Sequence, residues 1–196
     1  MLLDSFPNTL IKASKTCLLK KGEILFQQTD VVEALFFIIK GELCALRYQR
    51  DGKQAIMMRH NGGEIFAPAS MNLTVYPCAG VAFQDSRLLQ IPKSIFIKHL
   101  QHDIAFNQFY INSLANDLKK QCARSERLHL KSAKERVLHF IACESASGQE
   151  IRLNCPLSKW AEELGIEPES LYRTLSDMEK EGLIQRNKRT IKRVKR

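Results

Sequence analysis

The segment from Leu157 to Leu175 is the feature that most constrains how this chain folds. Two short amphipathic patterns meet there at Gly165, and the first spaces its apolar residues along one helix face: Leu157, Trp160, Ala161 and Leu164. Gly165 suits the left-handed turn that ends a helix. Pro168 suits the first turn of the next helix, and Glu167 can cap it. The segment predicts a helix-turn-helix, a motif whose second helix enters the DNA major groove.

The second helix of this motif separates apolar from polar side chains. Its buried stripe is predicted to contain Leu171, Leu175 and Met178. We expect DNA contacts from its outer face near the N-terminus and from one lysine of the first helix, that is, from Glu169, Ser170, Tyr172, Arg173 and Lys159. An ordinary helical hairpin has the same periodicity, so the pattern alone leaves both interpretations open.

A strongly basic segment follows the second helix. Residues 186–196 are rich in Lys and Arg and contain no acidic residue. A turn at Asn187-Lys188 predicts a small hairpin, or wing, which brings Lys188 and Arg189 beside the recognition helix. Such cations neutralise phosphates and release counterions. The alternative is a solvated tail, which would also attract nucleic acid.

Composition narrows the class of protein. The 196 residues are 44% hydrophobic with a net charge of +9 and a pI near 9.3, which favours a folded, basic protein over a disordered one. No apolar run is long enough to span a bilayer, and the N-terminus lacks the pattern of a signal peptide, so a cytoplasmic location is expected. The six cysteines show no C-x-x-C spacing, which indicates a reducing compartment and no zinc site.

The N-terminal half has the texture of an antiparallel β-structure. Short apolar or alternating runs are separated by Gly-containing turns, of which Asp51-Gly52 is a strong hairpin signal. The predicted strands cover residues 17–19, 24–26, 35–39, 43–48, 55–58 and 87–91. Many short strands at even spacing predict a rolled sheet. A leader helix is expected in residues 1–15.

Beyond Pro92 the pattern becomes helical. A short helix is predicted over residues 94–100, and Asp103 can cap a long helix that runs toward Leu128. The heptad residues Ile111, Leu114 and Leu118 predict a coiled-coil seam between two copies of the chain, although the helix could instead pack on its own domain. A further helix is expected over 131–144, with Val137, Phe140 and Ile141 inward.

The predicted fold class is α+β. It comprises a jelly-roll-like β-roll sensor domain (1–102), a dimerisation helix (103–130) and a winged helix-turn-helix (131–196). This order resembles the Crp/Fnr superfamily of bacterial transcription regulators over nearly the whole chain. The segments that carry the resemblance are 21–26, 35–43, 168–173 and 181–184.

The resemblance implies a homodimer that binds a palindromic operator in double-stranded DNA, with RNA polymerase as a further partner and no enzymatic activity. The family's recognition helix carries Arg-Glu-(Ser/Thr)-x-x-Arg, which Glu169, Ser170 and Arg173 match while Pro168 replaces the leading Arg. Arg173 and Glu169 would read a G·C pair, and Ser170 would hold a phosphate. Tyr172 is expected to discriminate between sequences.

The anchors for a cyclic nucleotide are missing. The family's Gly-Glu-Leu aligns here with residues 67–69, its phosphate-binding Arg aligns with Tyr76, and residues 60–86 contain no Arg or Lys. A buried phosphate without a cation is costly. We therefore expect no cAMP binding through the usual site, and the effector is unknown or absent.

The sequence gives weak support for sensing through an iron–sulfur cluster, haem, a metal ion or a redox-active cysteine. Cys17 stands alone where an iron–sulfur cluster needs several cysteines, and His60 or Cys78 could offer a haem ligand. His99 and His102 could form a metal face, and Cys78 or Cys122 could act as a redox switch, but core or exposed polar roles are the preferred interpretation of these residues. The alternatives left open are a regulator with redox- or haem-linked sensing, a constitutive regulator with a filled pocket, and a non-DNA-binding adaptor or regulatory subunit. No catalytic motif is present.

Overall fold

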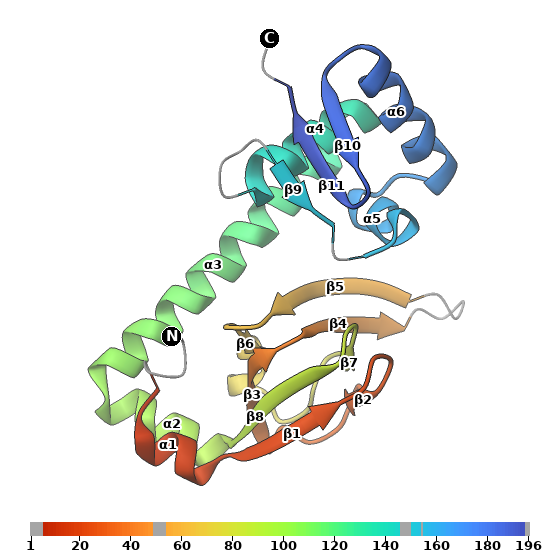
Figure 1. Cartoon of the computed structure of the whole chain (residues 1–196). Helices are drawn as coiled ribbons and strands as arrows, with labels where there is room; N and C mark the ends of the chain where they lie inside the picture. The colour runs from red at the N-terminus through yellow and green to blue at the C-terminus, as the bar shows by residue number, and fades with distance from the viewer. Residues whose placement is uncertain (1–5, 49–53, 146–149, 154, 195–196) are drawn as a thin grey trace. The chain divides into compact units, whose positions relative to one another are not determined.

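The computed structural model describes residues 6–48, 54–145, 150–153 and 155–194 (Figure 1). Its contacts separate into an N-terminal unit, residues 1–116, and a C-terminal unit, residues 117–196. Helix α3 (Ile104–His129) contributes to both units, and Asp103 caps it by accepting a hydrogen bond of 2.9 Å from the Phe106 amide. The predicted cap of this helix is therefore confirmed.

The N-terminal unit is built on two four-stranded sheets, with the strand orders β1-β8-β3-β6 and β2-β7-β4-β5. Every pairing within them is antiparallel, which confirms the predicted roll. The strands are β1 (Lys15–Leu19), β2 (Ile24–Phe26), β3 (Ala34–Lys40), β4 (Glu42–Tyr48), β5 (Gln54–Asn61), β6 (Ile65–Phe66), β7 (Ala79–Ala82) and β8 (Ser86–Pro92). The sequence did not predict β6 and β7.

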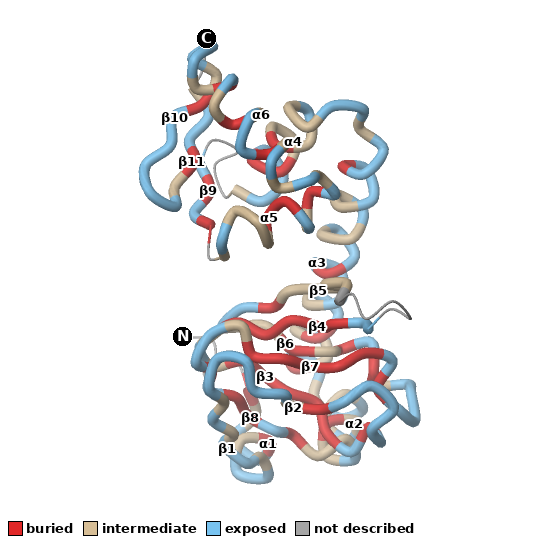
Figure 2. The backbone as a smooth tube through the Cα atoms, turned by 90° about the vertical axis from the view of Figure 1, so that its right-hand side faces the viewer, coloured by how far each residue is buried: buried red, intermediate tan, exposed pale blue. Residues whose placement is uncertain are grey.

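Strands β3 and β4 form the centre of the roll because their apolar runs are continuous. Both are buried over five consecutive residues. Figure 2 shows both strands largely in the colour of buried residues. Gly41 makes the turn between them at φ +108°, and a Cβ there would lie 2.1 Å from the Ser86 hydroxyl oxygen. Strands β4 and β5 pair from Glu42–Asn61 to Tyr48–Gln54, although the predicted Asp51-Gly52 turn lies outside the described residues.

Two large apolar cores and a small cluster of Cys44, Leu46 and Val81 stabilise the N-terminal unit. One fills the space between the sheets. The other lies under helices α1 (Asn8–Ala13) and α2 (Lys93–His102) and the start of α3, where Phe6, Phe37, Phe96, Phe106 and Tyr110 are buried together. The predicted leader helix is thus confirmed in its described part, whereas residues 1–5 lie outside the described chain.

The C-terminal unit combines helices α4 (Ala133–Glu144), α5 (Leu157–Leu164) and α6 (Pro168–Lys180) with a three-stranded antiparallel sheet. The sheet contains β9 (Glu150–Arg152), β10 (Ile184–Asn187) and β11 (Thr190–Arg193) in the order β10-β11-β9. The predicted wing consists of β10 and β11, and β9 pairs with the other edge of β11.

Helix α4 contributes the inward face that its periodicity predicts, with Val137, Phe140 and Ile141 buried. Ser132 and Glu135 form a capping box at its start, which the sequence reasoning did not identify. Among the described residues, no helix is both long and apolar enough to cross a membrane.

Candidate nucleic-acid interface

Helices α5 and α6 meet in the tight turn that the sequence predicts. Gly165 adopts φ +64° and donates to the Glu162 carbonyl over 3.2 Å, while the Ile166 amide donates to the Ala161 carbonyl over 2.9 Å. These bonds satisfy carbonyls that the end of α5 would otherwise leave unpaired. Glu167 occupies the N-cap position of α6, but its side chain makes no capping hydrogen bond. The prediction that its side chain caps the helix is therefore wrong, and Pro168 starts α6 without that cap.

A shared apolar core fixes the orientation of the two helices. Trp160 and Leu164 from α5 pack with Leu171, Leu175 and Met178 from α6, and each of these side chains is almost completely buried. The Phe140 ring of α4 meets the Trp160 ring edge-on, with centroids 5.4 Å apart. The buried stripe of α6 is as predicted, so the opposite face of the helix is exposed.

The exposed face of α6 carries the predicted reading residues. Glu169, Tyr172 and Arg173 are exposed, and Ser170 is half-buried. Because residues three and four apart lie side by side on a helix, Glu169 neighbours both Tyr172 and Arg173. An acceptor, an aromatic hydroxyl and a bidentate donor are thus grouped within the first two turns of α6.

The wing presents two cations at its turn. Lys188 and Arg189 are exposed between β10 and β11, and Lys188 adopts φ +53°. Arg186 is committed elsewhere: its Nε donates to a Glu179 carboxylate oxygen over 2.6 Å, and its amide donates to the other oxygen over 3.0 Å. The Arg186 side-chain hydrogen bond is the main cause that lowers the pKa of Glu179. The basic segment therefore offers less free charge than its composition suggests.

Lys159 also has an acidic partner. Its ammonium lies 2.9 and 3.1 Å from the two carboxylate oxygens of Glu162, one turn further along α5. Both side chains are exposed, so this pair is weak and can yield to a phosphate. The role predicted for Lys159 remains a prediction.

Two protein families and several characterised regulators resemble this chain. The cyclic nucleotide-binding domain family matches residues 17–103, and the Crp-like helix-turn-helix domain family matches residues 135–196. The transcriptional activator protein anr of Pseudomonas aeruginosa is 24% identical over 173 residues, covering 85% of this chain and 71% of that protein. The transcriptional activator protein FnrA of Stutzerimonas stutzeri is 23% identical over 180 residues, with the same two coverages.

Solved structures share the fold. FixK2 from Bradyrhizobium japonicum superposes with a TM-score of 0.76 at 20% identity and covers 93% of each chain. A CooA variant from Carboxydothermus hydrogenoformans superposes with a TM-score of 0.82 at 19% identity, covering 98% of this chain and 89% of its own. The chain belongs to the Crp/Fnr family. It is thus a transcription regulator with a helix-turn-helix DNA-binding domain, and such regulators are generally not enzymes.

Helix α3 of this Crp/Fnr regulator exposes an apolar stripe. Ile111, Leu114 and Leu118 are 51%, 36% and 65% exposed, and Ile104 and Leu128 are exposed in the same heptad register. Phe106 and Tyr110, on a neighbouring face of the helix, are buried in the N-terminal unit. The predicted seam is therefore accessible in a single copy of the chain.

The interior of the roll differs from a site for an anionic nucleotide. Tyr76, at the position aligned with the family's phosphate-binding Arg, is only 3% exposed and donates to the Ala34 carbonyl over 2.5 Å. Its ring stacks on Phe26 with centroids 3.7 Å apart, and the Phe36 and Phe66 rings lie 5.8 and 5.7 Å from Phe26. Burial raises the pKa of Tyr76 to about 12, which keeps the hydroxyl neutral.

The segment aligned with Gly-Glu-Leu is also occupied by internal contacts. Ala67 adopts φ +55° and starts the short 3-10 helix η2 (Pro68–Asn72). The Pro68 carbonyl accepts a 2.8 Å hydrogen bond from the Tyr110 hydroxyl of α3. This segment offers no carboxylate for a ribose, since it consists of Ala67, Pro68 and Ala69.

The candidate cysteine and histidine ligands are dispersed. His60 is buried with its ring edge-on to Phe66, and His99 contacts the Thr9 hydroxyl at 3.2 Å. Burial raises the pKa of the Cys78 thiol, whereas Cys122 is exposed on α3. The described part of the chain contains no cluster of three or more His, Cys, Asp or Glu side chains arranged to hold a metal ion.

Proposed function

We propose that this protein is a homodimeric regulator that binds a palindromic operator with the exposed face of α6. The observation that carries the proposal is the grouping of Glu169, Tyr172 and Arg173 on that face, above a buried core and beside a basic wing. A recognition helix reads base edges with the residues nearest its N-terminus, and these three positions fall in its first two turns.

Each side chain has a role that suits its chemistry. The Arg173 guanidinium donates to O6 and N7 of a guanine, and the Glu169 carboxylate accepts from N4 of a cytosine. Ser170 holds a phosphate, and Tyr172 distinguishes among neighbouring bases. Lys188, Arg189 and Lys159 neutralise backbone phosphates, which adds affinity without sequence preference. Pro168 brings no side-chain donor, so this protein makes one contact fewer there than the family pattern allows.

A second copy of the chain is the partner that fits the stripe on α3. Its exposed apolar residues repeat at heptad spacing, which suits a helix with the same repeat. Pairing of the two α3 helices places two recognition helices on half-sites about 34 Å apart. RNA polymerase, implied by the resemblance, remains a predicted further partner.

The roll does not bind a cyclic nucleotide in this proposal. The stacked Tyr76 and Phe26 rings favour a regulator that is active without an added effector. Isothermal titration with cAMP should show no saturable heat. Binding that saturates in the micromolar range would contradict this part of the proposal.

Selection of DNA from a random pool, with the purified full chain and no added ligand, tests the function directly. We expect enrichment of a palindrome. Arg173→Ala should lower affinity for it about ten- to hundredfold, because one bidentate base contact contributes about 1–3 kcal/mol. Lys131→Ala, which removes a charge from the connection between α3 and α4, is the matched control and should change affinity little. Equal affinity of the Arg173 variant and the wild type would contradict the assignment.

A further inference from the structure

One guanidinium joins the ends of two helices in the C-terminal unit. Arg136, in the first turn of α4, donates from Nε to the Leu130 carbonyl over 3.0 Å and from Nη2 to the Leu128 carbonyl over 3.2 Å. Its Nη1 donates to the carbonyls of Leu164 over 3.2 Å and Gly165 over 2.7 Å. The Leu128 carbonyl belongs to the last turn of α3, and the Leu130 carbonyl directly follows that helix. The other two carbonyls belong to the turn of the helix-turn-helix.

The chemistry of these acceptors explains why an arginine suits the position. The last carbonyls of a helix have no partner within it and carry its partial negative charge. A planar guanidinium has five donors in a fixed fork, so it can serve two helix ends at once. An ammonium on a flexible stem has three donors and cannot span the same four acceptors.

The two helix ends also touch directly. A Cβ at Gly165 would lie 2.8 Å from Leu128 Cδ2 and 3.1 Å from Arg136 Nη1. The glycine therefore lets the turn lie against the tips of these two side chains, which would have to shift to admit a Cβ. The turn at Gly165 thus lies next to both the Leu128 side chain of α3 and the Arg136 guanidinium.

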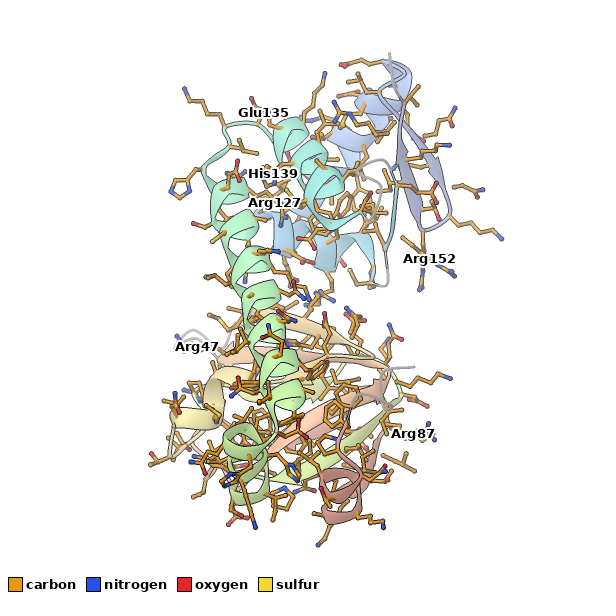
Figure 3. All side chains as sticks on the ribbon, turned by 90° about the vertical axis from the view of Figure 1, so that its left-hand side faces the viewer. Arg47, Arg87, Arg127, Glu135, His139 and Arg152 are labelled. Atoms are coloured by element: carbon orange, nitrogen blue, oxygen red, sulfur yellow. The ribbon has the colours of Figure 1, made fainter. Side chains whose placement is uncertain are left out.

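A second arginine braces the same connection from α3. Arg127 is 1% exposed, its guanidinium lies 4.5 Å from the centre of the Phe140 ring, and it pairs with Glu144 at 3.2 Å. Figure 3 labels Arg127 on α3 and His139 on α4. Each pairs with an acidic residue of the other helix, since His139 lies 3.3 Å from Glu126 of α3. The end of α3 is thus attached to the core of the helix-turn-helix through side chains as well as backbone.

We propose that Arg136 is a positioning residue that holds the recognition helix at a fixed orientation relative to α3. This inference rests on the proposed function, because α3 is the helix that would pair in the dimer. If α3 and the helix-turn-helix form one rigid piece, the distance between two recognition helices follows from the pairing of α3 alone. Arg136 then determines how strictly the dimer selects the spacing of its half-sites, without itself contacting DNA.

Operators with altered spacing separate this role from a general loss of affinity. The selected palindrome and a version with two additional central base pairs are titrated with wild type, Arg136→Ala, Arg136→Lys and Lys134→Ala. We expect the wild type to bind the lengthened site at least about a hundredfold more weakly. The alanine variant should bind the native spacing about tenfold more weakly and lose most of the discrimination between the two sites. The lysine variant should lie between the two.

Lys134→Ala is the matched control because it also removes a cation from α4. Lys134 forms an exposed ion pair with Glu181 at 2.5 Å and so connects α4 to the end of α6. The Lys134→Ala variant should keep the wild-type preference for half-site spacing. Thermal melting by circular dichroism and the fluorescence of Trp160 show whether each variant retains its fold.

A distance measurement tests the rigidity without DNA. Nitroxide labels are attached through an unnatural amino acid at the exposed residues Ser125 of α3 and Asp177 of α6, because Cys122 and Cys143 are exposed and would react with thiol-directed labels. Labelled chains are diluted with unlabelled chains so that only intrachain distances contribute. We expect a narrow distribution in the wild type and a clearly broader one in Arg136→Ala.

The two experiments fail in distinguishable ways. If the wild type selects no palindrome, the proposed function is wrong, and the intrachain distances still decide whether Arg136 holds the helices together. If the folded alanine variant keeps both the narrow distribution and the wild-type spacing preference, the positioning role is refuted.

Discussion

Replacing Tyr76 by phenylalanine tests whether the interior of the roll is a finished core. The variant keeps the ring that stacks on Phe26 at 3.7 Å and removes only the hydroxyl that donates to the Ala34 carbonyl over 2.5 Å. Ala34 lies opposite Pro92 in the β3–β8 ladder, and proline has no amide proton to donate to it. The buried carbonyl would thus lose the hydroxyl partner that the structure shows.

The difference in unfolding free energy between the wild type and this variant should depend on pH. At neutral pH, leaving a buried carbonyl unsatisfied costs about 1–3 kcal/mol of unfolding free energy. Burial raises the pKa of Tyr76 from 10.0 to about 12 in the folded protein. Above pH 10 the unfolded state therefore binds fewer protons than the folded state, and wild-type stability falls by about 1.4 kcal/mol per pH unit until the folded group titrates. The variant lacks this loss.

Urea unfolding between pH 7 and pH 11.5 measures both effects. Far-UV circular dichroism follows the unfolding of the whole chain, and the fluorescence of its single tryptophan, Trp160, follows the C-terminal unit. A change seen by circular dichroism and not by Trp160 fluorescence is assigned to the roll. We expect the wild type to be more stable at pH 7 and the difference to shrink above pH 10, vanishing between about pH 11 and pH 12. A difference that is absent at pH 7, or that stays constant across this range, would refute the reasoning.

Three further outcomes follow from the C-terminal unit and α3. Gly165→Ala should destabilise the C-terminal unit by about 1–2 kcal/mol, because alanine disfavours φ +64°, and unchanged urea midpoints of tryptophan fluorescence would contradict this. Leu118→Lys should convert a dimer to a folded monomer in light scattering, and a persisting dimer would place the seam elsewhere. Joint replacement of Lys188 and Arg189 by glutamine should reduce the salt slope of DNA binding by about 2. Arg186→Gln should leave the slope nearly unchanged, because Arg186 is paired with Glu179. Equal slopes in the two variants would contradict the assignment of Lys188 and Arg189, and not Arg186, to DNA phosphates.

Local signals made the helix-turn-helix predictable and the minor strands unpredictable. Gly165 and Pro168 punctuate two apolar stripes within twenty residues, so the motif follows from short-range pattern. Strand β7 consists of small residues around Gly80, and a Cβ there would lie 2.8 Å from both Phe26 and Phe66. Its place in the sheet depends on distant aromatic rings, which no local window contains.

The candidate interface was predicted in its residue types but not in its internal pairing. From composition alone, Arg186 is one more basic residue available to a phosphate. In the structure, Arg186 of β10 is hydrogen-bonded to Glu179 of α6. Arg136 left no signal because its acceptors are backbone carbonyls, which every residue possesses. Partners of this kind become visible only when the chain is folded.

The bond between Glu179 and Arg186 has a consequence for the DNA rather than for the protein. It ties the end of the recognition helix to the first strand of the wing through both the side chain and the backbone of Arg186. In the proposed complex, this bond fixes the offset between base contacts and wing phosphate contacts before any duplex arrives, so little ordering entropy remains to be lost on binding. A duplex whose groove width does not match that offset must deform itself to fit, so operators should be ranked by their flexibility as well as by their bases.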